Sequence, residues 1–191
     1  QRHTKMPERE EVTFELKQNG KIFGFPFCPM RIPSGAFAAL PFNIDLGGAR
    51  LRHATCEPVT KLEKDGKTTW FFRAQSDDKQ ELAVYRDGIV RFVSADFGIC
   101  EKTDDCFVIS SVEPSRDSWI DIELFNGKSI CICVLDDKTS KTLKKTKRGD
   151  MVFLTKAEMR EENGEIRFTQ TGCRSFETLI YPKNVRVKGE Y

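Results

Sequence analysis

Apolar and polar residues alternate along much of this chain, and that alternation predicts strands. In the segment 119–125, Ile120, Ile122 and Leu124 occupy every second position, with acidic residues between them. A period of two is the pattern of a half-buried β-strand, because successive side chains of a strand point to opposite faces. Helical periodicity is scarce elsewhere, so the chain is expected to be built almost entirely of strands.

Asx-Gly dipeptides punctuate this pattern at short intervals. Such pairs tolerate the positive φ angles of type I′ hairpin turns. The five pairs are Asn19-Gly20, Asp65-Gly66, Asp87-Gly88, Asn126-Gly127 and Asn163-Gly164. Each lies between runs of β-branched, aromatic or alternating residues, so each predicts a hairpin. Together they predict an all-β, antiparallel β-sandwich of the supersandwich or jelly-roll-like kind.

Two shorter segments modify this picture. The segment Thr139–Lys147 follows an acidic pair, ends in lysines and predicts a short surface helix or a turn, because these charges suit the helix dipole. The fold is thus expected to contain at most one short helix. Gly47-Gly48 is followed by no helix, so it is interpreted as a strand bend or wide turn rather than a dinucleotide-binding fingerprint. The 15 phenylalanines are expected to fill the space between two sheets.

The length of 191 residues suits one large β domain or two small ones. We expect a β-sandwich region over residues 1–112. Residues 113–191 would continue it, or form a smaller β lobe packed on the first, with the PSRD turn at Pro114–Asp117 as the boundary. The chain starts at Gln1 with a polar segment, and we expect that it has been trimmed from a longer precursor.

Charge and hydropathy exclude two classes of partner. Lys and Arg number 31 against 29 Asp and Glu, for a net charge of +2, which gives little reason to expect a nucleic-acid partner. The basic run from Lys138 to Arg148 is flanked by Asp136, Asp137 and Asp150 and is interpreted as a solvated face rather than a nucleic-acid patch. No apolar run approaches the roughly 18 residues of a membrane span.

The cysteines and histidines predict neither a metal site nor a cofactor. Seven cysteines leave at least one unpaired, and the two histidines do not lie at zinc-ligand spacing from a cysteine pair. Free thiols acting as small core residues are the favoured interpretation. The alternative left open is a disulfide between Cys100 and Cys106, which flank the segment EKTDD.

No motif in this chain predicts a catalytic residue. The acidic pairs Asp104-Asp105, Asp136-Asp137 and Glu161-Glu162 lie in polar stretches typical of solvated loops. The serines have no G-x-S-x-G setting. We therefore expect the chain itself to be non-catalytic.

Aromatic residues are the candidates for carbohydrate contact. Sugars stack apolar faces on aromatic rings and hydrogen-bond through their hydroxyls. Trp70 lies in the run Trp70–Phe72, and Trp119 follows the PSRD turn beside Arg116 and Asp117. The alternative for both tryptophans is packing in the core or against another module.

Several of these motifs together resemble a known family. LPFNIDL (40–46), LRHATCEP (51–58) and TTWFF (68–72) are followed by VLDDKTS (134–140) and a closing YP at 181–182. This order resembles the non-catalytic β region that follows the barrel in bacterial glycoside hydrolase family 35 β-galactosidases. The resemblance covers about Phe25 to Pro182.

The resemblance implies a function that this chain would not perform alone. Family members hydrolyse terminal β-galactosides with retention, using two glutamates on a (β/α)₈ barrel, which needs about 250 residues. The chain has neither that length nor the alternating helices. The implied role is an accessory module packed on the catalytic barrel of the same polypeptide. The whole enzyme would be secreted or periplasmic, and its ligands would be galactoside-containing glycans. The alternatives are a free-standing carbohydrate-binding module, a ligand-free interaction domain and an independent small enzyme.

Overall fold

The chain folds almost entirely into β-strands, as the alternating pattern predicts. The computed structural model describes residues 7–18, 20–172 and 175–183, which form seventeen strands and one short helix. The predicted all-β, antiparallel sandwich class is confirmed. Within these residues no helix has the length and apolar character needed to cross a membrane.

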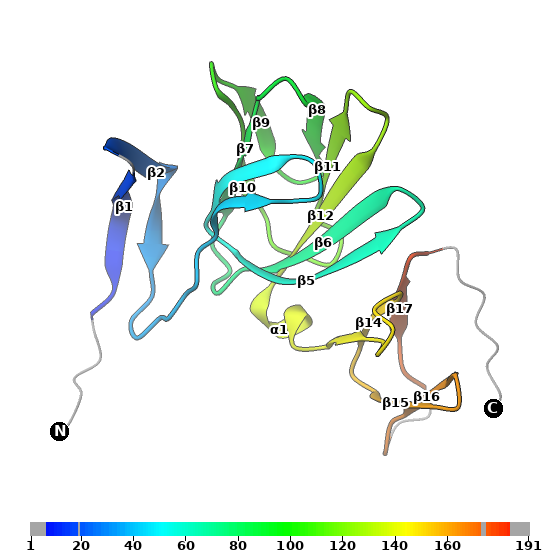
Figure 1. The fold of residues 1–191 in the computed structure, drawn as a ribbon. Coiled ribbons are helices and arrows are strands. Elements are labelled where there is room, and N and C mark those ends of the chain that lie inside the picture. The colour runs from blue at the N-terminus through cyan, green and yellow to red at the C-terminus, as the bar shows by residue number, and fades with distance from the viewer. Residues whose placement is uncertain (1–6, 19, 173–174, 184–191) are drawn as a thin grey trace.

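Two five-stranded sheets face each other and form the sandwich (Figure 1). The first sheet has the order β3-β4-β7-β10-β9, with β3 at Phe42–Asp45, β4 at Arg50–Ala54, β7 at Gln80–Tyr85, β10 at Cys106–Val112 and β9 at Ile99–Lys102. The second has the order β5-β6-β12-β11-β8, with β5 at Glu57–Lys64, β6 at Lys67–Arg73, β12 at Ser129–Leu135, β11 at Trp119–Leu124 and β8 at Val90–Ala95. Neighbouring strands are antiparallel except β6 and β12, which pair in parallel.

The main core lies between the two sheets. Leu51 and Leu82 from the first sheet and Phe72 and Ile132 from the second are all fully buried there. Burying a side chain of this size stabilises the fold by roughly 1.5–3 kcal/mol. The expectation that phenylalanines fill this space is wrong, because Phe72 is the one phenylalanine among its buried members in the described part of the chain. Leucine and β-branched residues fill it instead.

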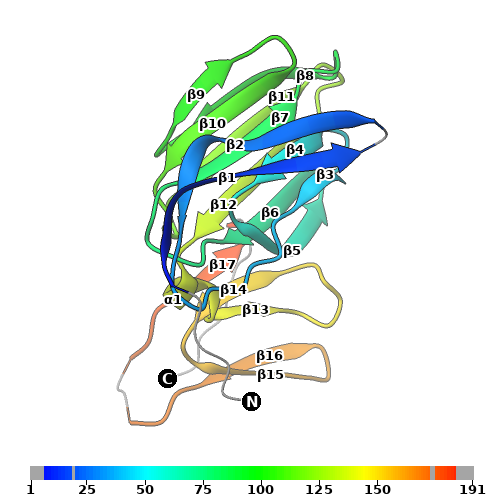
Figure 2. The same cartoon turned by 90° about the vertical axis from the view of Figure 1, so that its left-hand side faces the viewer.

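A long hairpin packs across the outer face of the first sheet. It consists of β1 (Arg9–Gln18) and β2 (Lys21–Ile32), which pair only with each other among the described strands. Figure 2 shows it crossing in front of β4, β7 and β10. Its aromatic residues reach the sheet, since the ring of Phe25 lies 5.9 Å from that of Phe42 on β3.

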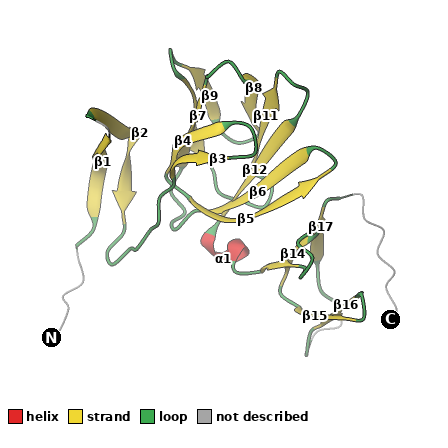
Figure 3. Ribbon diagram, viewed as in Figure 1, coloured by secondary structure: helices red, strands yellow, loops and turns green. Residues whose placement is uncertain are grey.

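A smaller lobe packs on the outer face of the second sheet. After Leu135 the chain forms the helix α1 and a three-stranded sheet of order β13-β14-β17; the hairpin β15–β16 follows β14 (Figure 3). Their bounds are α1 Asp137–Ser140, β13 Leu143–Lys145, β14 Val152–Thr155, β15 Glu158–Glu162, β16 Glu165–Thr169 and β17 Thr178–Tyr181. A second apolar cluster joins the lobe to the sandwich, with Phe71 from β6, Leu154 from β14 and Tyr181 from β17.

The boundary between the sandwich and the smaller lobe lies later in the chain than the predicted boundary at residue 113. Strands β11 and β12 follow the turn at Pro114–Asp117 and belong to the second sheet of the sandwich. The smaller lobe therefore begins after Leu135.

Four of the five predicted hairpins form. Antiparallel pairing joins β5 to β6, β11 to β12 and β15 to β16 around their Asx-Gly turns, and β1 to β2 around a turn in which Asn19 lies outside the described residues. The hairpin predicted at Asp87-Gly88 is wrong. The strands on either side of it, β7 and β8, belong to different sheets, so this turn carries the chain across the sandwich.

The predicted helix is shorter than expected and starts earlier. It covers Asp137–Ser140, and Asp136 caps it by accepting a hydrogen bond from the Thr139 amide at 2.7 Å. Leu143–Lys145, predicted as helix, is the edge strand β13. Pairing with β14 decides this, because an isolated two-turn helix is marginal in water.

The Gly47-Gly48 turn links β3 to β4. Asp45 Oδ1 accepts hydrogen bonds from both glycine amides, at 2.8 and 2.9 Å. Gly47 has a φ of 105°, and a Cβ there would lie 2.9 Å from Thr68 Oγ1 on the facing sheet. Glycine is therefore required both by the backbone and by the close approach of the second sheet.

Candidate functional site

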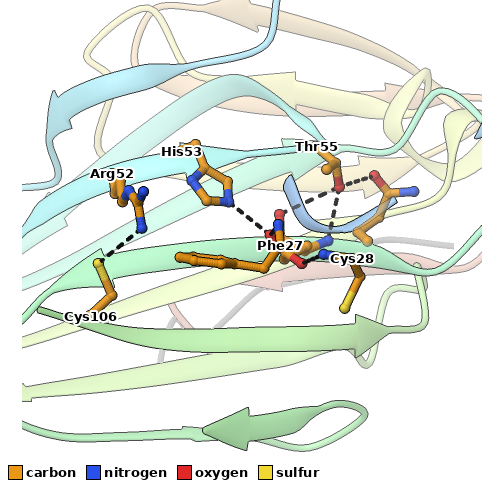
Figure 4. A network of polar contacts seen from close by, with 8 residues as sticks. Phe27, Cys28, Arg52, His53, Thr55 and Cys106 are labelled. Carbon is orange, nitrogen blue, oxygen red and sulfur yellow. Dashed lines mark hydrogen bonds and ion pairs between the residues drawn. The ribbon is translucent and has the colours of Figure 1, made fainter. Parts of the chain in front are cut away.

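A buried carboxylate connects the β1–β2 hairpin to the first sheet. Figure 4 shows this polar network, with Phe27, Cys28 and His53 labelled. Glu81, in the apolar strand β7, accepts hydrogen bonds from the backbone amides of Phe27 and Cys28, each at 2.7 Å. Its Oε1 also lies 2.8 Å from His53 Nε2 on β4. Since an ionised carboxylate only accepts hydrogen bonds, Nε2 carries the proton and donates it.

The two amides are available because β2 leaves its ladder at this point. Val12 on β1 pairs with Met30, whereas Phe14 pairs with Phe25, so the segment 26–29 bulges out of the hairpin. An amide in a bulge has no strand partner, and a buried amide without one is unfavourable. Glu81 supplies the missing acceptors for Phe27 and Cys28.

His53 is fully buried between aromatic rings. The rings of Phe25 and Phe27 each lie 5.5 Å from its imidazole. Its Nδ1 has no hydrogen-bond partner. Beside it, the Arg52 guanidinium lies 4.6 Å from the centre of the Phe27 ring and 3.9 Å from Cys106 Sγ.

Electrostatics fix the protonation of this cluster near neutral pH. Burial acts to raise the pKa of Glu81, but the hydrogen bonds from His53, Cys28 and Phe27 outweigh it, and the net shift is downward. Burial and the nearby Glu81 raise the pKa of the Cys28 thiol. The carboxylate is therefore ionised and the thiol protonated.

That protonation pattern does not suit nucleophilic catalysis. Cysteine reacts as its thiolate, which a neighbouring cation favours and a neighbouring carboxylate disfavours. Although His53, Glu81 and Cys28 have the composition of a catalytic triad, His53 Nε2 bonds the carboxylate. The arrangement suits attachment of the hairpin to the sheet, and we call Glu81 and its three donors the hairpin clamp.

A cleft of about 570 Å³ lies beside the clamp, between the hairpin and the sandwich. Its walls come from both parts, including Phe14, Phe25 and Met30 from the hairpin and Thr55 and Gln80 from the sandwich. At its rim, Arg31 Nε lies 3.0 Å from Asp78 Oδ2. The cleft exists in this form only while the hairpin is docked.

A second cleft, of about 490 Å³, lies between the sandwich and the small lobe. Most of its lining residues are of polar type, and they include Arg116, Thr139 and Lys156 beside the half-exposed Phe176. Arg116 Nη1 donates to Glu177 Oε1 at 2.9 Å across this cleft. The cleft thus combines one aromatic ring with charged and hydroxyl groups.

The predicted carbohydrate-contact residues do not form one site. Trp70 donates from Nε1 to the Leu46 carbonyl at 2.8 Å and packs against the main core. Trp119 packs against the other cluster, 5.3 Å from the Tyr181 ring. Arg116 lines the second cleft, and Asp117 is exposed beside it, 3.8 Å from Arg116 Nε.

An edge of the sandwich carries exposed apolar side chains. Ten large hydrophobic side chains are exposed among the described residues, and half of them lie on β8, β9 or the adjoining turns. This set, which we call the β8–β9 edge, consists of Ile89, Phe92, Phe97, Ile99 and Phe125. The Phe125 amide bonds the Ile89 carbonyl at 2.9 Å, so the two turns at one end of this edge adjoin.

The described cysteines are free thiols. Cys100 is exposed and Cys106 buried, and no disulfide joins them. Burial raises the pKa of Cys131 to about 11, with Asp121, to which its thiol donates at 2.5 Å, contributing in the same direction. Cys173 lies outside the described residues. Among the residues described, no group of His, Cys, Asp or Glu side chains is arranged to hold a metal ion.

The hairpin clamp was not predicted from the sequence. One signal was present, because the carboxylate Glu81 directly precedes the apolar run LAVY in the same strand, and a charge in such a strand must find partners when buried. Its partner His53 is 28 positions away and its amide partners are more than 50 away, so the sequence pattern does not connect them.

Comparison with known proteins adds no relative to this description. No family model matches the chain, and no curated protein matches it.

Proposed function

We propose that this chain is an accessory, non-catalytic β-domain of a β-galactosidase-like glycoside hydrolase, packed on the catalytic barrel of the same polypeptide. The observation that carries the packing role is the β8–β9 edge, along which Ile89, Phe92, Phe97, Ile99 and Phe125 are each exposed. Exposed apolar side chains that gather on one surface mark contacts with another protein surface. The parent enzyme would be secreted or periplasmic.

The resemblance to family 35 supports the identity of the partner. The motifs that carry it, LPFNIDL, LRHATCEP and TTWFF, form β3, β4, β6 and the segments next to them. These strands come from both sheets, so the similar residues are the scaffold of the sandwich. A scaffold role is what a non-catalytic module requires of them.

The chemistry of the described residues supports a non-catalytic role. In the described residues, the carboxylate of the buried His53–Glu81 pair already accepts hydrogen bonds from two backbone amides of the hairpin. The tryptophans predicted to contact sugars pack against apolar clusters.

The second candidate is a free-standing carbohydrate-binding module. The polar cleft with Arg116 and Phe176 favours it, because a sugar needs an aromatic face and hydrogen-bonding groups together. Calorimetric titration of this chain with galactosides, xylans and host glycans separates the two. Binding that is lost in Arg116→Ala supports the carbohydrate-binding module. No detectable binding of any of the three classes of glycan supports the accessory domain.

The full open reading frame and an activity assay test the leading proposal. A barrel-sized segment of about 250 residues before Gln1 is expected. The isolated chain should not turn over a chromogenic β-galactoside, whereas the full protein should. Turnover by the isolated chain, or a reading frame without a barrel, would overturn the proposal.

The packing role has its own test in the full protein. The double variant Phe92→Ser, Phe125→Ser should lower the thermal stability of the full protein but not that of the isolated chain. Phe37→Ser is the matched control, because Phe37 is 87% exposed but lies outside the β8–β9 edge. Equal effects of the edge variant on both proteins would refute packing through this edge.

A further inference from the structure

The β1–β2 hairpin is attached to the sandwich without any shared sheet. Its two strands form a separate two-stranded sheet, and no described strand of the sandwich extends it. An isolated two-stranded hairpin is marginally stable in water. Its position therefore depends on the side chains that connect it to β3, β4 and β7.

Glu81 is the most buried polar connection of the hairpin. Its side chain is 4% exposed and holds both amides of the bulge. We infer that Glu81 is an acid-operated latch, and that protonation of this one carboxylate releases the β1–β2 hairpin while the sandwich stays folded. The inference does not depend on the proposed hydrolase.

The chemistry of the clamp explains why one proton is enough. All three partners of Glu81 are N–H donors, from Phe27, Cys28 and His53. An ionised carboxylate offers about four lone-pair sites and accepts all three bonds, whereas a protonated one carries its own donor. The proton added to Glu81 would point at groups that are themselves donors. At least one of the three hydrogen bonds to the carboxylate is therefore lost.

The direction of the pH effect follows from the pKa of Glu81. The pKa lies below its usual value of 4.5 in the docked state, because the three hydrogen bonds outweigh the effect of burial. A carboxyl with a lowered folded-state pKa stabilises the docked hairpin fully above its ordinary pKa. That stabilisation is lost as the pH falls through the folded-state pKa.

Other titratable and charged groups around the latch come from four strands. Arg52 and His53 lie on β4, Cys28 on β2, Cys106 on β10 and Glu101 on β9. The buried Arg52 stacks on the Phe27 ring. The thiols stay protonated in acid, because their pKa values are raised. Glu101 acts on the Cys28 thiol rather than on Glu81.

A second carboxylate, Asp78, also joins the hairpin to the sandwich. Asp78 accepts from Arg31 at 3.0 Å, but its side chain is 36% exposed, and exposed ion pairs contribute little. Asp78 is thus the natural comparison for Glu81.

Release of the hairpin would open the 570 Å³ cleft, because Phe14, Phe25 and Met30 form one of its walls. It would also expose Phe25, which is 6% exposed in the docked state. The latch therefore controls the exposure of apolar side chains of the hairpin and access to the sandwich side of the cleft, which includes Thr55 and Gln80.

The test follows the hairpin and the sandwich separately by NMR. The full chain, labelled with ¹⁵N, is titrated from pH 7 to pH 3, and the amides of Phe27 and Cys28 report the hairpin. The indole of Trp70, bonded to the Leu46 carbonyl, reports the sandwich. As the pH falls from about 4.5 through the lower folded-state pKa of Glu81, the two amides should move to unstructured positions while the Trp70 indole signal stays unchanged.

Three variants make the test specific. Glu81→Gln should show a released hairpin at pH 7 and no change on acidification. His53→Phe keeps a ring between Phe25 and Phe27 but removes a donor, so the release midpoint should rise by on the order of 1 pH unit. Asp78→Asn should leave the midpoint unchanged.

Two results would overturn the latch. One is simultaneous loss of the Phe27, Cys28 and Trp70 signals in acid, which means global unfolding. The other is an acid transition that persists in Glu81→Gln or disappears in Asp78→Asn. If Glu81→Gln does not fold, the midpoint in His53→Phe decides, and a midpoint that fails to rise contradicts the proposal.

Discussion

The hairpin and the small lobe are both attached to outer faces of the sandwich, but by different kinds of contact. The hairpin is held on the first sheet by a buried carboxylate and its donors, in addition to the packing of Phe25 on Phe42. The lobe is held on the second sheet by the apolar cluster of Phe71, Trp119 and Tyr181. Apolar burial is independent of pH and non-directional, whereas the clamp needs one protonation state and one geometry. The comparison predicts that the lobe stays attached under conditions that release the hairpin.

The largest effect is expected at the centre of the apolar attachment. Phe71 is fully buried and lies 5.3 Å from the Tyr181 ring. Phe71→Ala should lower the free energy of unfolding by about 3–5 kcal/mol, because it removes a large side chain and leaves a cavity. Urea denaturation at pH 7 measures this. Phe125→Ala, at a 68% exposed position, is the control, and equal losses in the two variants would show that burial is not the cause.

A smaller and more local effect is expected at the clamp. Glu81→Ala leaves the amides of Phe27 and Cys28 without an acceptor and should weaken docking of the hairpin by roughly 2–3 kcal/mol. Amide hydrogen exchange in β1 and β2 should quicken while β11 and β12 keep their protection. Glu8→Ala is the matched control, since Glu8 is an exposed carboxylate that pairs with Arg31 within the hairpin. Unchanged exchange in Glu81→Ala would remove the distinction between the two attachments.

The smallest effect is expected from the exposed ion pairs that accompany both attachments. Asp78 pairs with Arg31 beside the hairpin, and Glu177 pairs with Arg116 beside the lobe. Because exposed pairs are screened by solvent and salt, Asp78→Asn and Glu177→Gln should each leave the urea midpoint almost unchanged. Denaturation at low and high salt checks this, and a large shift in either variant would mean that polar contacts matter equally on both sides.

Local patterns were enough to predict the strands and most of the turns. The alternation in Ile120–Leu124 reappears as β11, whose apolar side chains face the core. Asp65 and Gly66 have φ angles of 51° and 76°, the positive values that the dipeptide predicts. These features depend on neighbouring residues, and the sequence displays neighbours directly.

Pairing between distant strands was not predictable in the same way. Asp87-Gly88 permits a turn, but whether the flanking strands pair depends on which sheet each completes, and β7 and β8 complete different sheets. The run Trp70–Phe72 shows the same limit. Its residues face opposite sides of β6, and both sides are covered, one by the main core and the other by the small lobe. When both faces of a strand are covered, residues on both faces are apolar. The sequence then lacks the alternation of apolar and polar residues that would identify an exposed face.

The candidate site was the least predictable part. The spacing of His53 and Glu81 in the sequence does not indicate that they pair. The amides that complete the clamp belong to a bulge in another sheet. Arg116 was predicted as a contact residue from its place beside Trp119, yet the fold directs Arg116 to a polar cleft and Trp119 to an apolar cluster.

The parallel pairing of β6 with β12 has a consequence for the order in which the chain can fold. Lys67 pairs with Ser129, so more than sixty residues separate the partners. During synthesis from the N-terminus, the β5–β6 hairpin emerges with one edge unpaired and must wait for β7 to β11 before its partner exists. Contacts of this length slow folding, and an open strand edge invites pairing with other chains. A fragment that ends before Ser129 would keep that edge open permanently, and the sandwich is complete only once the chain extends to the end of β12.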